Sequence, residues 1–247
     1  MKLDLSILDR HERIALSFSG GKDSLAVVYL LRDHLDRVAV YHLDTGDLLP
    51  EQVEVVRHVE RMAPNFVRVE THVNDWIARN GLPTDLLPYS AHEIGQAMGA
   101  GRKLVTRFEC CYANLMLPLW QQIVDDGNTL VIRGTKRADM ARLPASSGEV
   151  YDGVELFHPL DNWTNDDVFA YLDEVGAPIS RVYQHVTNSP ECARCPAWWG
   201  EKRAAYLRQF YPSLFADYAL RLRVVSAEIT GPLNNLGAEL AIVNGAT

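Results

Sequence analysis

RIALSFSGGKDS, residues 13–24, is the stretch that decides the fold of this chain. Residues 13–18 form a short apolar run, which predicts a buried β-strand. A glycine pair follows, and residues 23–32 then place apolar side chains at the spacing of a helix. The stretch therefore predicts a strand, a tight glycine turn and a helix.

The turn at residues 19–24 has the chemistry of a phosphate-binding loop. Paired glycines let the backbone turn sharply and point amide groups at an anion, and the following helix adds its positive dipole end. Lys22 supplies a cation, and Ser19 and Ser24 supply hydroxyl donors. Asp23 can help hold Mg²⁺ or cap the helix. The alternative is an ordinary strand-to-helix turn with Asp23 as its cap.

Further strand and helix patterns follow the first unit. An apolar run at residues 37–43 leads into a helix predicted over residues 50–62, and residues 66–70 and 129–133 predict two more strands. Strands that alternate with helices indicate an α/β fold with a doubly wound, mostly parallel sheet and helices on both faces.

The pattern of predicted elements changes after residue 148. A hairpin with its turn near Asp152-Gly153 and a helix capped by Thr164 and ending at Glu174 are predicted. Amphipathic helices are expected at residues 201–210 and 213–225, and the tail beyond is unassigned.

This reading divides the chain into two domains. Residues 1–160 are predicted to form a nucleotide-binding α/β domain. Residues 161–247 are predicted to form a C-terminal helical segment that packs on it and completes a cysteine site.

Composition limits the class of protein. Hydrophobic residues make up 47% of the 247, and the net charge is −8, which argues against a coat of positive potential for nucleic acid but allows a local basic groove. No apolar run approaches the roughly 20 residues needed to span a bilayer, and the N-terminus lacks the pattern of a signal peptide. We expect a cytoplasmic protein without membrane contact.

The chain has four cysteines, Cys110, Cys111, Cys192 and Cys195. In a reducing cytosol such a set is more typical of metal binding or catalysis than of disulfides. A zinc site usually takes two spaced pairs, whereas a four-iron cluster accepts thiolates on four separate corners. The adjacent pair is therefore an unusual ligand pattern for a zinc site.

SGGKDS resembles the signature of the PP-loop ATP pyrophosphatase superfamily and differs from the GxxxxGK[ST] loop of P-loop NTPases. LDTG at residues 43–46 with Pro50-Glu51, RGTKR at residues 133–137 and PLDNWT at residues 159–164 are similar to the phosphoadenosine-phosphosulfate reductase branch. The resemblance covers about residues 13–200. It implies an adenine nucleotide α-hydrolase-like fold and cleavage of ATP to AMP and pyrophosphate.

Candidate site residues follow from the loop, the strand ends and this resemblance. A carboxylate at the carboxyl edge of the second strand lies where open sheets bind ligands, so Asp44 can contact ribose or Mg²⁺; capping the next helix is its alternative role. The predicted catalytic residues are Lys22, Asp23 and Asp44. The predicted nucleotide-binding residues are Ser17, Ser19, Gly20, Gly21, Lys22, Asp23, Ser24, Asp44, Thr45, Gly46, Gly134 and Arg137.

A basic group follows the strand at residues 129–133. It suits a pyrophosphate, a sulfate or a nucleic-acid backbone, although a solvated basic loop explains any single member equally well. Its members are Arg133, Lys136, Arg137 and Arg142.

The cysteine pattern, CC followed far downstream by CxxC, resembles the adenylylsulfate reductases that bind a [4Fe–4S] cluster through all four cysteines. This resemblance favours a cluster over zinc, and zinc over four unrelated buried thiols. Two departures separate the chain from those reductases. Their phosphate loop is typically degenerate, whereas SGGKDS is intact here. Their chemistry also uses a further nucleophilic cysteine in an ECGxH-like segment, and no cysteine follows Cys195 in this sequence.

These features predict an ATP pyrophosphatase that adenylylates an acceptor for iron–sulfur-assisted sulfur transfer, as in DNA phosphorothioation. ATP, Mg²⁺ and a [4Fe–4S] cluster are the expected cofactors. A sulfur donor such as a cysteine desulfurase, a nucleic-acid acceptor and a homodimer or larger complex are the expected partners. The alternative is a reductase of adenylylsulfate or phosphoadenylylsulfate. A tRNA thiolase and a nucleotide-sensing subunit are further readings.

Overall fold

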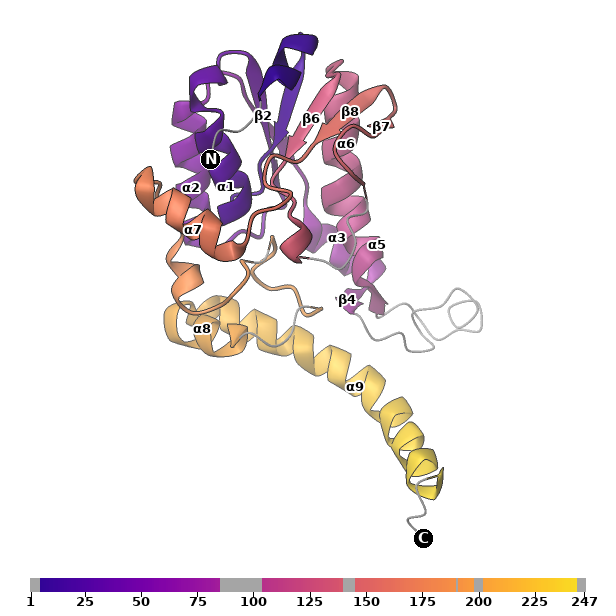
Figure 1. Ribbon diagram of the computed structural model, residues 1–247. Helices are drawn as coiled ribbons and strands as arrows, with labels where there is room; N and C mark the ends of the chain where they lie inside the picture. Colours follow the sequence, from indigo (N-terminus) through magenta and orange to yellow (C-terminus); the bar gives the residue numbers. More distant parts are fainter. Residues whose placement is uncertain (1–4, 85–103, 140–144, 190, 198–201, 244–247) are drawn as a thin grey trace. The chain divides into compact units, whose positions relative to one another are not determined.

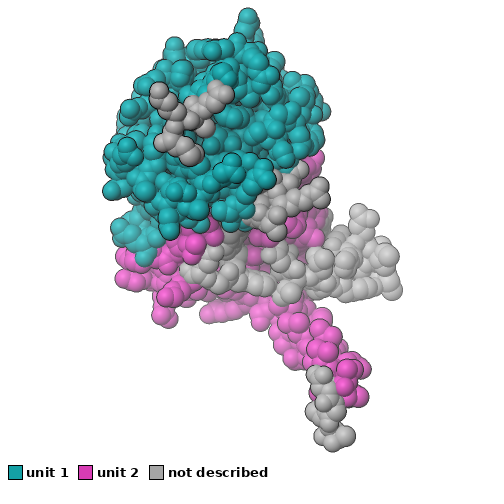
Figure 2. Space-filling view, viewed as in Figure 1, with its two compact units in different colours: residues 1–71, 115–184 teal, residues 72–114, 185–247 magenta. Residues whose placement is uncertain are grey.

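The computed structural model describes residues 5–84, 104–139, 145–189, 191–197 and 202–243. The chain divides into two compact units, shown in teal and magenta in Figure 2. The first contains residues 1–71 and 115–184, and the second contains residues 72–114 and 185–247. Each unit is made of two separate stretches of the chain. The division into domains at residue 160 stays a prediction.

The first unit is built on a six-stranded sheet in the order β3-β2-β1-β6-β8-β7 (Figure 1). Neighbouring strands pair in parallel except β7 and β8, which form an antiparallel hairpin. The strands are β1 (Ile14–Ser17), β2 (Val38–Asp44), β3 (Phe66–Glu70), β6 (Leu130–Arg133), β7 (Val150–Tyr151) and β8 (Val154–Phe157). The predicted mostly parallel sheet is confirmed.

The hairpin turns at the two residues that the sequence indicated. Asp152 has φ 52° and Gly153 has φ 81°, so both lie in the left-handed region that two-residue hairpin turns require. β7 therefore adds a short antiparallel edge to the sheet.

Helices cover both faces of the sheet. One apolar cluster joins Ile14 and Leu16 of β1 to α1, α2 and α7, and a second joins Ala15 to α6 on the opposite face. Alternate residues of a strand point to opposite faces, so a fully apolar β1 is buried on both. The helices are α1 (Lys22–Leu30), α2 (Pro50–Met62), α6 (Leu117–Asp125) and α7 (Asn165–Glu174), with short turns η1 (Ser6–Arg10), η2 (Arg32–His34), η5 (Arg137–Asp139) and η6 (Arg181–Gln184). The doubly wound fold is confirmed.

The strand order reverses direction between β1 and β6. From β1 the chain proceeds outward to β2 and β3, and β6 then returns to the other side of β1. In open α/β sheets the crevice beyond the carboxyl ends of the strands at such a switch point is where ligands bind. The loop after β1 and the residues after β6 both lie at this point.

Helix α7 begins at the cap predicted from the sequence. The Thr164 hydroxyl accepts a hydrogen bond from the Asp167 amide (3.1 Å), and the Asp167 carboxylate accepts one from the Thr164 amide (2.8 Å). This reciprocal capping box satisfies amide groups that the first turn leaves without partners.

The second unit contains a small parallel sheet that the sequence did not indicate. β4 pairs with β5 over three residues each, too short for a clear alternation of polar and apolar residues. The elements of this unit are α3 (Val73–Asn80), β4 (Leu82–Thr84), β5 (Leu104–Thr106), α5 (Arg107–Cys111), α8 (Arg203–Phe210) and α9 (Pro212–Val243); the π-helical turn η4 (Tyr112–Met116) spans the boundary of the units.

Helix α9 corrects a predicted helix end. The sequence placed the end at Val225, but α9 continues to Val243 through Gly231 and Pro232. Val225 is the last buried residue of α9, and residues 230–243 are exposed, so the amphipathic signal stops where burial stops. Within the described part of the chain, none of the helices combines the length and apolar composition needed to span a lipid bilayer.

We expect Thr164→Ala to lower the free energy of unfolding by about 1 kcal/mol, because the cap hydroxyl is lost. Thr164→Ser keeps a hydroxyl in the same place and is the matched control. Urea denaturation followed by circular dichroism measures both. Equal destabilisation by the two substitutions would contradict the capping role.

Candidate nucleotide site and cysteine site

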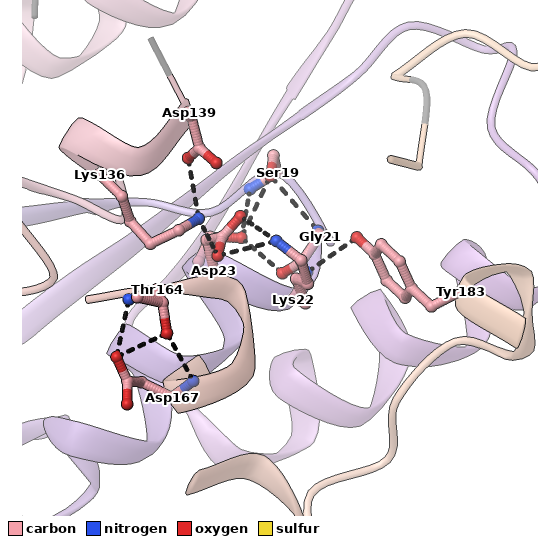
Figure 3. Close-up of polar contacts among 10 residues, drawn as sticks. Ser19, Gly21, Lys22, Asp23, Lys136, Asp139, Thr164, Asp167 and Tyr183 are labelled. Atoms are coloured by element: carbon pink, nitrogen blue, oxygen red, sulfur yellow. Dashed lines mark hydrogen bonds and ion pairs between the residues drawn. The ribbon is translucent and has the colours of Figure 1, made fainter. Parts of the chain in front are cut away.

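The loop between β1 and α1 is closed by its own serines (Figure 3). The Ser24 hydroxyl accepts a hydrogen bond from the Ser19 amide (3.2 Å) and donates one to the Gly21 carbonyl (3.1 Å). Gly20 has φ +83°, a conformation that a side chain would strain. Helix α1 begins at Lys22, so the loop leads directly into a helix N-terminus, an arrangement suited to an anion.

Two lysines meet at one carboxylate beside this loop (Figure 3). Asp23 lies 2.8 Å from the ammonium of Lys22 and 2.5 Å from the ammonium of Lys136. Lys136 also pairs with Asp139 at 2.8 Å. Two cations and two carboxylates therefore form one network at the sheet's switch point.

Both ammonium groups of this network are buried, and burial changes their pKa values. The side chain of Lys136 is 0% exposed and that of Lys22 is 3% exposed. Burial lowers the pKa of Lys22, with Asp23 opposing the shift. Burial also opposes the charge on Lys136, but Asp139 and Asp23 more than offset it and raise the pKa of that amine. Buried ammonium groups persist only where anions compensate them, and Asp23 and Asp139 do so here.

Gly134 sets how closely β6 approaches the loop. A Cβ atom built on Gly134 would lie 2.7 Å from the carbonyl carbon of Asp23 and 2.8 Å from the Ser24 amide nitrogen. The strand end therefore touches the backbone at the start of α1. The structure gives this glycine a packing role, and its predicted contact with nucleotide stays a prediction.

The sequence missed the aromatic groups around Lys22. The Tyr183 hydroxyl accepts a hydrogen bond from the Lys22 amide (3.0 Å). The Lys22 ammonium lies 5.8 Å from the ring centroid of Phe169 and 6.0 Å from that of Tyr183. Nothing in the sequence signalled these contacts, because the aromatic residues follow the loop by more than a hundred positions.

Asp44 ends β2 in a network of its own. Its carboxylate accepts a hydrogen bond from the Gly46 amide (2.9 Å) and pairs with Arg68 at 3.1 Å. Gly46 has φ +74° in the turn that follows, and Thr45 is buried beside it. The structure thus shows Asp44 ordering the turn, and its contact with ribose or Mg²⁺ stays a prediction.

The other predicted basic residues are placed differently. Arg137 is exposed and forms a two-point ion pair with Asp161, with both N–O distances 2.9 Å. Ser17 ends β1 beside Arg133 of β6. Arg142 lies outside the described residues.

The four cysteines belong to the second unit. Cys110 is buried in an apolar cluster with Val73 and Val105, against which Cys192 also packs. Burial, then the neighbouring thiols of Cys111 and Cys195, raise the pKa of Cys110 to about 12. The elements around α5 therefore bring residues 110–111 into the neighbourhood of residues 192–195.

Arginines accompany the cysteines. Arg203 is buried and donates a hydrogen bond to the Cys195 carbonyl (3.3 Å). Burial raises the pKa of the Cys195 thiol, and the positive charges of Arg203 and Arg107 oppose that shift. The charge of Arg221 likewise opposes the rise in the pKa of Cys110. Arg221 also donates a hydrogen bond to the side-chain oxygen of Asn74 (2.6 Å). A positive shell of this kind favours thiolates or another anionic group.

Among the described residues, no three His, Cys, Asp or Glu side chains are arranged so that they could hold one metal ion. A cubane cluster binds each thiolate through a different iron atom, so its ligands need not converge on one point. The chemistry of four thiols within a cationic shell fits such a cluster.

The fold is a doubly wound α/β sheet with a glycine-containing loop between β1 and α1 at its switch point. Residues 13–198 match the phosphoadenosine phosphosulfate reductase domain, and the chain belongs to that family of enzymes. The predicted family is thereby confirmed.

Named relatives agree with this assignment. The chain is 23% identical over 189 residues to an adenosine 5′-phosphosulfate reductase of Allochromatium vinosum, covering 74% of this chain and 68% of the relative. It is 23% identical over 212 residues to the reductase of the same name from Burkholderia cepacia, covering 79% of each. A solved U34-tRNA thiolase of Methanococcus maripaludis, with its [4Fe–4S] cluster, shares the fold at 15% identity and a TM-score of 0.51, over 91% of this chain and 76% of that one.

We expect Gly134→Ala to destabilise the first unit by about 1–3 kcal/mol, because the added methyl group meets backbone that cannot move aside. Gly231→Ala is the control, since a Cβ there meets nothing within 4 Å. Thermal unfolding measures the difference. A Gly134→Ala protein that melts like the wild type would show that β6 does not press on the loop as described.

Proposed function

We propose that this protein binds ATP at the loop of residues 19–24 and cleaves it between the α and β phosphates, which activates an acceptor for sulfur transfer. The observation that carries the proposal is the pair of buried ammonium groups, Lys22 and Lys136, which share the carboxylate of Asp23. An intact phosphate loop with two such cations suits a polyphosphate better than an uncharged ligand.

Nucleotide binding would exchange partners within this network. Phosphate oxygens accept from Lys22 and Lys136 in place of the carboxylate, and Asp23, whose side chain is 25% exposed, becomes available to Mg²⁺. The loop amides and the dipole of α1 add donors for the same oxygens. Each element of the network then has a use in the bound state.

The proposed reaction needs charge neutralised on the leaving group. An acceptor oxygen attacks the α-phosphorus, the bond to the bridging oxygen breaks, and pyrophosphate leaves with the negative charge. Lys22, Lys136 and the loop amides are placed to stabilise that charge as it grows. The acceptor, now an adenylate, loses AMP when a sulfur nucleophile attacks.

The cysteines would supply the sulfur side of this chemistry. In the proposal Cys110, Cys111, Cys192 and Cys195 hold a [4Fe–4S] cluster, which when bound provides a centre for sulfur or electron transfer. The arginines around them offset the negative charge of such a group. A cysteine desulfurase as donor and a nucleic acid as acceptor, as in DNA phosphorothioation, complete the proposal.

A reductase of adenylylsulfate or phosphoadenylylsulfate is the second candidate. The named relatives favour it, since they are adenosine 5′-phosphosulfate reductases. Sulfite formed from adenylylsulfate by anaerobically purified protein with thioredoxin would establish it. Formation of AMP and pyrophosphate from ATP, without sulfite from adenylylsulfate, supports the first candidate.

We expect Lys22→Met and Lys136→Met each to slow the release of AMP and pyrophosphate from ATP by about 100-fold or more, because a cation on the leaving group is lost. Arg32→Met, on an exposed side chain of η2, is the control and should stay within about twofold of wild type. Anion-exchange separation of the nucleotides measures both products.

The products also decide the cleavage site. ADP and phosphate as the sole products, with purified protein and its acceptor, would overturn the proposal. If Lys136→Met and the wild type released AMP and pyrophosphate at equal rates, Lys136 would have no part in the proposed reaction.

We expect anaerobically purified protein to contain about four iron and four sulfide per chain, and Cys110→Ser or Cys195→Ser to lose both. Ser189→Ala removes a buried hydroxyl that has no partner among the described residues, and it is the control in the same segment as Cys192 and Cys195. Metal and sulfide analysis provides the measurement. Stoichiometric zinc in place of iron would contradict the cluster.

A further inference from the structure

Arg133 and His158 occupy matching positions on neighbouring strands. β6 and β8 pair in parallel with Ile132 opposite Phe157, so the residues that follow, Arg133 and His158, come side by side. Val131 and Leu156, two positions earlier on each strand, face the cluster under α6. Because side chains alternate along a strand, Arg133 and His158 point to that same face.

Both residues carry buried nitrogen atoms without hydrogen-bond partners. His158 is 5% exposed, and neither of its ring nitrogens is bonded within the described residues. The Nε of Arg133 is likewise buried and unbonded there. An unsatisfied buried polar group costs about 1–3 kcal/mol, and buried polar groups in proteins are almost always bonded. Two neighbouring exceptions indicate a ligand.

The acidic groups nearby are already paired. Asp161 is held by Arg137, Glu155 by Arg10 and His11, and Glu149 by Tyr151. Within the described chain no carboxylate forms an ion pair with Arg133.

The guanidinium of Arg133 is instead held by an aromatic ring. It lies 5.6 Å from the centroid of Trp120 of α6, and Trp120 donates its ring N–H to Asp152 at 2.7 Å. The hydrogen bond fixes the ring, and the ring orients the cation. Arg133 is therefore positioned and charged, yet has no anionic partner among the described residues.

We propose that Arg133 and His158 form a binding site for a tetrahedral oxyanion, a phosphoryl or sulfuryl group. The guanidinium supplies the charge and several N–H donors, and arginine matches such oxygens better than any other side chain. Burial and the charge of Arg133 lower the pKa of His158, so its ring is neutral and offers one donor and one acceptor.

The position of the site suggests which substrate it serves. Arg133 directly precedes Gly134, which touches the Asp23 backbone beside the phosphate loop. A second anionic group bound there would lie at the same switch point as the nucleotide. Resting on the proposed function, we infer that the oxyanion is the anionic end of the acceptor that ATP activates.

The test is an NMR titration of full-length protein labelled in its histidines. Sodium sulfate and sodium phosphate are added separately at constant ionic strength, and His158→Asn identifies the signals of His158. We expect either anion to shift these signals saturably and to raise the pKa of His158, because an anion stabilises the imidazolium. Arg133→Gln should weaken the anion's apparent affinity by about tenfold or more, since a charged partner is lost. Arg32→Gln should not change it.

Signals of His158 that neither anion moves, or that move equally in Arg133→Gln and wild type, overturn the proposal. The larger response of the two anions identifies the group as phosphoryl or sulfuryl. The products formed from ATP are measured separately on the same protein preparation, with Mg²⁺ and the acceptor present. Saturable anion binding together with ADP and phosphate as the sole products would refute the proposed function and leave the oxyanion site standing.

Discussion

The pairing of two buried lysines with one carboxylate is the constraint on which the proposed nucleotide site depends. Lys136 has no exposed side-chain surface and still carries a charge, which the chain can sustain only because Asp23 and Asp139 lie within 2.8 Å of its ammonium. Asp23 belongs to the loop after β1, whereas Lys136 follows β6. The ion pair therefore ties together the two strands between which the sheet changes direction.

The backbone supports this arrangement by close packing. Gly134 brings the end of β6 against the start of α1, so Lys136 is delivered from the neighbouring strand at short range. The strands beneath are apolar on both faces, with α1, α2 and α7 on one side and α6 on the other. A rigid sheet of this kind allows charged groups to be held at its edge with little rearrangement.

The charged groups around the cysteines of the second unit have the opposite sign to those around the lysines of the first unit. Its thiols are buried or half-buried and surrounded by arginines, whereas the first unit surrounds its cations with carboxylates. In the proposed function the first unit binds a polyphosphate and the second unit binds a thiolate-ligated cluster.

The sequence alone determined the doubly wound sheet, the glycine turn between β1 and α1, the cap of α7 and the family, because each depends on local periodicity or on adjacent residues. It also singled out the cysteine quartet. The tertiary structure alone decided that Lys136 is the buried partner of Asp23, that Tyr183 closes over Lys22, that α9 runs on to Val243, and that Arg133 and His158 lie together. These features depend on contacts between residues far apart in the chain, and no local pattern of polarity records which distant side chain a charge will meet.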